Sequence, residues 1–417
     1  MVAIWRWQGV AILGALTSLG GVPHEGTHAA VGPAIAPADQ SPAEASKTSP
    51  AALSARADEA MAAGKHAEAA EWFERLTDAA PKSPRAWAGL VRSYDQEGRR
   101  SYGELVRVAP KSPYVSLIVA DALAAVGKLP EAFALYRKVE AALPKHPGLH
   151  EAVADVYDKA GHADWAARER ARTAVPDCAR PSAACTFLTG DFRDTLQRTK
   201  NAQADEDWYW RVRALNQLAT RALAALERLP PSVELHTVRA SLAESQNRPQ
   251  AAVDELRAAL ELTPGDRTLE RRLATALYLA HDHEAMLPIT QQLLAKTPDD
   301  PELQFLHGSA LLEAQQIERA IPPLERAVAA DPSLLQARAA LGRAFVMQGK
   351  MAAAIPHLEA ALPSDRDGNL YYQLAQAYQR TGRRDQARAA LEKYQALRQR
   401  AETTTVATGA APTITPP

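Results

Sequence analysis

The chain has 417 residues, 47% of them hydrophobic, so it is long enough for several domains or for one elongated repeat array with a buried core. Its 48 basic and 49 acidic residues leave a formal net charge of −1. A chain this close to neutral offers no electrostatic reason to expect nucleic acid or an anionic membrane surface as a partner.

Residues 1–30 are predicted to be an export signal. Arg6 and the amino terminus supply positive charge, and Val10–Leu19 is an apolar stretch followed by small residues. This stretch is short for a bilayer span. Cleavage after Gly20 and cleavage after Ala29 both fit the pattern, and an uncleaved N-terminal anchor is the alternative. We therefore expect an exported protein of the periplasm or cell envelope, with secretion as a variant of the same prediction.

Three residues of this region match the zinc-protease pattern His-Glu-x-x-His: His24, Glu25 and His28. The pattern is chemically active when both histidines project from one helix face onto zinc and the glutamate activates the bound water. Here Gly26 weakens any helix, and the Ala/Pro/Ser-rich residues 31–50 that follow are predicted to be a disordered linker. We therefore predict no catalysis, metal or cofactor, and a zinc metallopeptidase is the disfavoured alternative.

The body of the chain repeats with a period of 34 residues, in units that start at Val233, Arg267, Pro301 and Leu335. Small residues recur where two helices must approach closely, and large apolar residues recur on the stripe expected to be buried. The small column is Ala240, Ala274, Gly308 and Gly342; the large column is Ala243, Leu277, Leu311 and Phe345.

Prolines and glycines repeat with the same period. One proline column is expected to stop the second helix of each unit, and the other to lie early in that helix, where the backbone N–H has no intrahelical partner. These columns are Pro264, Pro298 and Pro332, and Pro288, Pro322 and Pro356. Glycine is expected in the turn between the two helices because it adopts the left-handed conformation readily. The turn positions are Gly64, Gly98, Gly127, Gly161, Gly349 and Gly382, with Asn247, His281 and Gln315 as replacements.

Several segments, including "AWAGLVRSYDQEGR" and "HGSALLEAQQIERAIPPLERAVAADP", resemble tetratricopeptide repeats. The first half of the family pattern is matched by Trp87, Leu90, Tyr94 and Gly98, and the second half by Ala320, Leu324, Ala327 and Pro332. The resemblance covers about residues 51–400. It implies an all-α fold, a right-handed solenoid of stacked antiparallel helix pairs.

Two repeat segments are expected, residues 51–175 and 205–400, joined by an irregular connector at 176–204 and followed by a disordered tail at 401–417. The unit after Pro84 is shortened, so its second helix is expected to be short. The unit Asp205–Ser232 loses residues at its turn. The last helix, Arg384–Arg400, ends in a polar sequence that suits a cap at the end of a stacked array.

The two cysteines, Cys178 and Cys185, both lie in the connector. In an exported chain such a pair favours a disulfide, and two buried thiols are the alternative. The sequence His281-Asp282-His283-Glu284 resembles a ligand cluster, but its phase places it in a turn between helices, where successive side chains diverge. We expect a solvated turn there.

The resemblance implies that the first helix of each unit lines a groove that binds a protein or peptide. Tyrosine and arginine are frequent at binding hot spots, although any one such residue can also simply pack or solvate a ridge. The positions implied are Tyr209, Arg213, Asn216, Arg271, Thr275, Tyr278, Phe305, Ser309, Arg343, Asn369, Tyr372 and Gln376.

The N-terminal groove is expected to be mildly acidic, with Asp121, Glu151, Asp155 and Asp158, so that the two segments bind different surfaces. The lysines and asparagines with which some family members grip a C-terminal carboxylate are absent from the corresponding positions. The predicted function is an exported scaffold or adaptor for a protein or peptide of unknown identity. A structural envelope component that assembles with copies of itself is the alternative.

Overall fold

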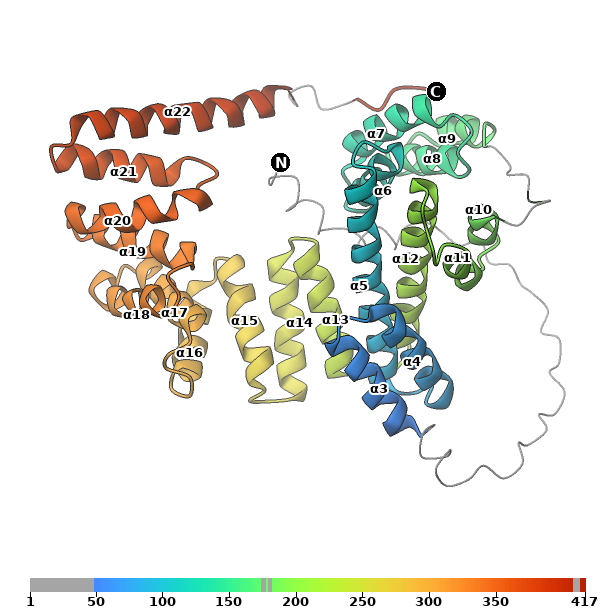
Figure 1. Ribbon diagram of the computed structural model, residues 1–417, viewed down its shortest axis with the longest axis horizontal. Coiled ribbons are helices and arrows are strands. Elements are labelled where there is room, and N and C mark those ends of the chain that lie inside the picture. The colour runs from blue at the N-terminus through green and yellow to red at the C-terminus, as the bar shows by residue number, and fades with distance from the viewer. Residues whose placement is uncertain (1–48, 174–177, 179–181, 408–412) are drawn as a thin grey trace. The chain divides into compact units, whose positions relative to one another are not determined.

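A computed structural model describes residues 49–173, 178, 182–407 and 413–417, and these residues form helices and connecting turns without any β-strand (Figure 1). The predicted export signal and the His24-Glu25-His28 motif lie outside the described residues. Two compact units are present: unit 1 is Met1–Asn247 with Ala411–Pro417, and unit 2 is Arg248–Ala410. No helix in the described part of the chain is long and apolar enough to cross a lipid bilayer.

Unit 1 contains three helix pairs, one short pair and three further helices. The pairs are α3 (Pro50–Ala62) with α4 (His66–Ala79), α6 (Pro113–Ala125) with α7 (Leu129–Ala142), and α8 (Leu149–Lys159) with α9 (Ala163–Arg170). The short pair is α10 (Ala183–Leu188) with α11 (Phe192–Arg198), in the predicted connector. The others are α5 (Pro84–Val108), α12 (Asp205–Glu227) and α13 (Val233–Ser245).

A Ser-Pro dipeptide starts three of these helices. The side chains of Ser49, Ser83 and Ser112 accept hydrogen bonds from backbone N–H groups of the first helical turn. The proline that follows each serine occupies the first helical position, where a missing N–H costs nothing. The repeated prolines of the N-terminal half therefore mark helix starts, as the sequence indicates for Pro50, Pro84 and Pro113.

The predicted turn at Gly98 does not exist. Gly98 lies inside α5, which continues for 25 residues from Pro84 to Val108, so the unit after Pro84 has no separate short second helix. The unit that begins at Asp205 behaves in the same way, because α12 is one helix of 23 residues. Both sequences had lost residues around the turn, and one continuous helix is the physical result.

The two long helices pack against each other in antiparallel directions. The end of α12 packs with α3, α4, the start of α5 and α13 in one hydrophobic cluster. The start of α12 packs with α6, α7 and α8 in a second cluster. Because α12 belongs to both clusters, the connector at 176–204 does not separate two segments, and the boundary between the units falls after Asn247 instead.

Unit 2 is a stack of helix pairs, each helix packing against the next (Figure 1). The helices are α14 (Pro249–Leu262), α15 (Arg267–Leu279), α16 (His283–Leu294), α17 (Pro301–Glu313), α18 (Ile317–Ala330), α19 (Leu335–Met347), α20 (Met351–Ala361), the 3₁₀ turn η2 (Leu362–Ser364), α21 (Asn369–Arg380) and α22 (Arg384–Ala407). The first helices of successive pairs also contact one another: α15 with α17, α17 with α19, and α19 with α21. They form a continuous layer.

The small-residue column lies where the two helices of a pair come closest. A Cβ atom added at Gly308 would be 2.6 Å from Cγ of Leu324, and one at Gly342 would be 2.6 Å from Cδ2 of Leu358. Only glycine lets these helices approach so closely, which confirms the reason inferred from the sequence for a small residue at this phase.

The predicted turn positions other than Gly98 have positive φ angles, among them Gly349 at 80° and the three non-glycine replacements, Asn247 at 54°, His281 at 59° and Gln315 at 60°. One proline column lies deeper than predicted. Pro288, Pro322 and Pro356 are each the sixth residue of their helices and so lie in the interior, where a proline removes a backbone hydrogen bond.

The C-terminal end also differs from the prediction. Helix α22 continues past Arg400 to Ala407, so the predicted tail is partly helical. Thr413–Pro417 belong to unit 1, and Ile414 packs against its second hydrophobic cluster. The end of the chain therefore has a defined contact that its composition did not indicate.

Candidate partner-binding surfaces

The layer of first helices in unit 2 carries exposed apolar side chains. The exposed fractions are 53% for Leu279 on α15, 38% for Met347 on α19 and 44% for Tyr372 on α21. Leu279, Glu313 and Met347 lie 34 residues apart, so they occupy equivalent positions on three helices that contact one another. We call Leu279, Glu313, Met347 and Tyr372 the first-helix strip.

Arg271 lies on the same layer and is held by two acidic residues at the start of α17. Its Nη2 atom donates to Oδ1 of Asp300 at 3.2 Å and to Oε2 of Glu302 at 2.5 Å. Burial alone raises the pKa of Asp300, but the bond from Arg271 holds it below its usual value. Thr275, one turn further along α15, donates to the carbonyl oxygen of Arg271 at 3.2 Å.

Two aromatic residues of the predicted set meet between α15 and α17. The ring of Tyr278 stands edge-on to the ring of Phe305, with centroids 5.3 Å apart. Phe305 is buried, as is Ser309 on the same helix, so neither presents its side chain to solvent. Arg343 on α19 pairs with Glu313 and so brings charge to the first-helix strip.

The predicted positions on α21 are more open. Asn369 and Tyr372 are exposed, and Gln376 is half-buried. The Asn369 side chain donates to Asp367, in the loop before α21. Tyr372 packs against Tyr394 of α22, with ring centroids 5.3 Å apart, which restricts the ring while one face remains accessible.

Sequence reasoning missed Leu279, Glu313 and Met347, although the signal was present. Each follows directly after a position at the twelfth phase of its unit, and the period of 34 places the three in one column. The column mixes two large apolar residues with one charged residue, so it does not have the pattern of a buried stripe. Reading the thirteenth phase as well as the twelfth would have found it.

The three predicted residues on α12 belong to unit 1 and are not on an open surface. Tyr209 has no exposed area, and Asn216 is buried. Arg213 donates to the Tyr209 hydroxyl at 2.6 Å and lies 3.3 Å from the carboxylate of Asp121. Burial raises the pKa of Asp121, and Arg213 opposes that shift. We therefore interpret these residues as a buried polar cluster that joins α12 to α6.

The acidic wall expected in the N-terminal half is largely paired. Arg170 on α9 donates to Glu151 at 2.8 Å and to Asp155 at 3.0 Å, and it lies 2.8 Å from Asp158. Since Asp121 is paired with Arg213, each of the four predicted acidic residues has a basic partner. The difference in charge predicted between the two grooves is correspondingly smaller.

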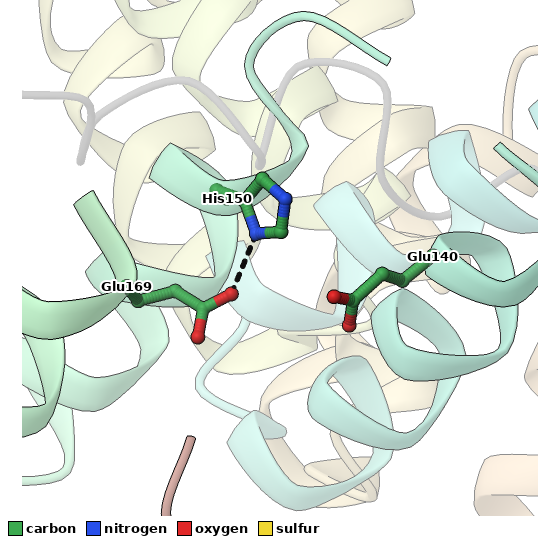
Figure 2. Close-up of side chains that lie close together, drawn as sticks. All are labelled: Glu140, His150 and Glu169. Atoms are coloured by element: carbon green, nitrogen blue, oxygen red, sulfur yellow. Dashed lines mark hydrogen bonds and ion pairs between the residues drawn. The ribbon is translucent and has the colours of Figure 1, made fainter. Parts of the chain in front are cut away.

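Three helices of unit 1 meet at Glu140, His150 and Glu169, whose ligand atoms all lie within 4.8 Å of one another (Figure 2). Nδ1 of His150 lies 2.7 Å from Oε1 of Glu169, which is fully buried. Two guanidinium groups already occupy the carboxylates: Arg137 donates to Glu140 at 2.6 Å and Arg172 donates to Glu140 at 2.6 Å, and both lie within 3.3 Å of Glu169. We interpret the cluster as an ion-pair network and not as a metal site.

A pocket of about 330 Å³ lies in unit 1 between α5, α12 and the turn before α11. Its wall is mostly aromatic and aliphatic, with two arginines. The lining residues that matter most for its chemistry are Trp87, Tyr94, Phe192, Arg193 and Arg221. Arg221 lies over the ring of Phe192, 4.3 Å from its centroid, so its charge is already partly satisfied.

The connector contains a disulfide between Cys178 and Cys185, whose Cα atoms are 5.7 Å apart. The bond ties the residue before α10 to the first turn of that helix. The histidines of the His281–Glu284 sequence lie at the turn between α15 and α16, with His281 exposed and its ring 5.9 Å from that of His283. The turn is where the phase of the repeat had placed it.

Tetratricopeptide repeat profiles match most of the chain, at residues 54–100, 96–147, 213–267, 271–334, 305–369 and 368–400. The chain belongs to the tetratricopeptide repeat family. The predicted all-α fold of helix pairs is therefore confirmed. Tetratricopeptide repeats are protein-interaction modules, and in this family the stacked helices present side chains for binding.

Solved structures similar to part of the chain include several MamA proteins. A MamA RS-1 ArsTM double mutant is 20% identical over 41% of this chain and 97% of its own, with a TM-score of 0.36. MamA 41-end from Desulfovibrio magneticus RS-1 is 20% identical over 40% and 95%, with a TM-score of 0.36. MamA AMB-1 C2221 is 23% identical over 39% and 95%, with a TM-score of 0.33. No curated protein matches the chain.

Proposed function

We propose that the protein is an exported scaffold whose unit 2 binds a protein or peptide partner along the first-helix strip, without catalysis of its own. The observation that carries the proposal is the exposure of Leu279, Met347 and Tyr372 on helices that contact one another. Exposed apolar residues gathered in one region of a soluble surface are typical of interaction sites.

The chemistry of the surface indicates the kind of segment it accepts. Apolar side chains of a partner would cover Leu279, Met347 and Tyr372, while polar groups would reach Arg343 and Glu313 between them. Both charged residues are about two-fifths exposed, so a partner can compete for their ion pair at low cost. A partner segment with apolar residues around a polar centre fits this arrangement.

The test is quantitative cross-linking in cells that produce the full chain. The variant Leu279→Ser/Met347→Ser/Tyr372→Ser removes the apolar part of the strip, and we expect it to reduce the main cross-linked partner at least tenfold, since removal of hot-spot side chains has effects of this size. The matched control is Leu262→Ser/Leu391→Ser, which changes two exposed leucines on the second helices α14 and α22. Equal losses in both variants, or no loss in either, would count against the proposal.

Export is the second part of the proposal. The apolar stretch near the N-terminus and the Cys178–Cys185 disulfide both support an oxidising compartment outside the cytoplasm. Mass spectrometry of the mature protein from fractionated cells tests this directly. A mature N-terminus after Gly20 or Ala29 is expected, and an intact Met1 in the cytoplasmic fraction would contradict it.

A further inference from the structure

The last five residues of the chain rest on unit 1. Ile414 packs against the hydrophobic cluster that contains Val153 and Tyr157. The hydroxyl of Tyr157 donates to the backbone carbonyl oxygen of Thr415 at 2.7 Å. Figure 1 shows this end of the chain beside α7 and α8. One apolar side chain and one backbone carbonyl therefore anchor the segment.

The tyrosine that makes this contact is held by the ion-pair network beneath it. Arg137 donates to the Tyr157 hydroxyl oxygen at 2.8 Å and to Glu140 at 2.6 Å. The buried Glu169 holds the same guanidinium group at 3.3 Å. Because Arg137 occupies the acceptor side of the hydroxyl, the proton of Tyr157 is directed outward to an acceptor. The network thus prepares a hydrogen-bond donor at the surface.

The residues beside Tyr157 suit proline. The Trp165 ring stands edge-on to Tyr157, with centroids 5.6 Å apart, and His162 stacks on Trp165 at 4.0 Å. Trp165 is half-buried and packs against the same cluster as Ile414. Aromatic rings together with a hydroxyl donor are the elements with which proteins bind extended proline-rich segments.

The segment itself has the matching chemistry. Its sequence is Thr-Ile-Thr-Pro-Pro, and the carbonyl that Tyr157 binds belongs to the residue directly before the first proline. A residue before proline is driven into the extended region, and proline fixes its own φ angle. The segment loses little conformational freedom on binding, and its carbonyl groups remain available as acceptors.

We propose that the surface formed by Tyr157, Trp165 and their cluster on α8 and α9 is a binding site for extended segments with a branched aliphatic residue two positions before a Pro-Pro pair. The chain's own C-terminus, Thr413–Pro417, is its tethered ligand. A partner segment of the same chemistry binds by displacing this tail. The site lies in unit 1 and does not depend on the function proposed for unit 2.

The test uses a dye-labelled peptide Thr-Ile-Thr-Pro-Pro and fluorescence anisotropy. A chain that ends at residue 412 is expected to bind the peptide about tenfold more tightly than the full chain, because the tethered tail competes at high effective concentration. Equal binding by both chains would show that the tail does not occupy the site. No binding by the truncated chain would overturn the proposal entirely.

Two further measurements separate the site from a general effect on folding. In the truncated chain, Tyr157→Phe is expected to weaken binding about threefold to tenfold, the size of one hydrogen bond. Tyr94→Phe removes a hydroxyl that binds Glu74 elsewhere in unit 1 and should leave the affinity unchanged. The peptides Thr-Ala-Thr-Pro-Pro and Thr-Ile-Thr-Ala-Ala should each bind at least fivefold more weakly. Unchanged affinity for both altered peptides would overturn the proposed recognition.

Discussion

Arg211 on α12 and Glu97 on α5 form a buried ion pair, with Nη2 and Oε1 2.8 Å apart and side chains that are 11% and 7% exposed. Arg211 also donates to Ser101 at 3.2 Å. The two residues are 114 positions apart in the sequence. They join the two long helices at the middle of unit 1, where the repeat pattern is interrupted in both partners.

Removal of one member of this pair should be costly. Arg211→Leu leaves the Glu97 carboxylate buried without its closest cation, and we expect a loss of about 3 kcal/mol in the free energy of unfolding. The double variant Arg211→Leu/Glu97→Leu should recover most of that loss, because no buried charge remains. Urea denaturation followed by circular dichroism measures both. Arg107→Leu, which removes an exposed partner of Glu104, is the control and should change stability by less than about 1 kcal/mol.

Two helical glycines should respond in opposite directions to alanine. At Gly308 a new Cβ would lie 2.6 Å from Cγ of Leu324 and 3.2 Å from the carbonyl oxygen of Ala320, so Gly308→Ala should cost about 1–3 kcal/mol. At Gly103 in α5 nothing lies within 4 Å of the new atom, so Gly103→Ala should stabilise the helix by up to about 1 kcal/mol. Thermal unfolding of the two variants gives the sign of each change, and the same sign for both would contradict this account.

The non-glycine residues in the left-handed turns store strain that glycine would relieve. His281 and Gln315 have φ angles of 59° and 60°, where a side chain costs about 1 kcal/mol. His281→Gly and Gln315→Gly should therefore raise the free energy of unfolding by about that amount. Asn247→Gly should gain less, because asparagine tolerates this conformation. Gly349→Ala is the reverse control and should be destabilising, since the φ of Gly349 is 80°. Chemical denaturation of the four variants would show whether this order holds.

His146 should make unit 1 sensitive to acid. Burial, and secondarily the charge of Arg213, lower the pKa of His146 from 6.5 to about 4. The ring stacks on Trp210, with centroids 5.3 Å apart. Between these two pKa values the unfolded chain binds more protons than the folded chain, so stability falls as the pH drops through that window. We expect a loss of about 2 kcal/mol from this residue between about pH 7 and about pH 4.5.

The measurement is the urea midpoint at both pH values for the wild type and for His146→Phe, which keeps an aromatic ring but cannot be protonated. His283, His307 and His357 also have lowered pKa values, so part of the acid effect should persist in the variant. A variant that loses as much stability as the wild type would show that His146 does not contribute.

The candidate surface was only partly predictable. The repeat phase placed Arg271, Tyr278, Arg343 and Tyr372 on the layer of first helices, since the phase of a residue within its unit determines which face of its helix it occupies. The same rule failed for Tyr209 and Asn216, because α12 is covered by elements other than its sequence neighbours. Burial there depends on α6 and on the second hydrophobic cluster.

The sequence by itself determined the helix pairs, their turns and the close contacts within each pair of unit 2. These features recur every 34 residues and depend on interactions between adjacent units, so local patterns encode them. Only the tertiary structure decided that α5 and α12 are continuous and pack together, that the unit boundary follows Asn247, and that Thr413–Pro417 rest on Tyr157. Each of these involves residues more than 90 positions apart, as in the bonds between Ser112 and Asp205 and between Tyr157 and Thr415. Contacts at such separation repeat with no period and therefore leave no pattern in the sequence.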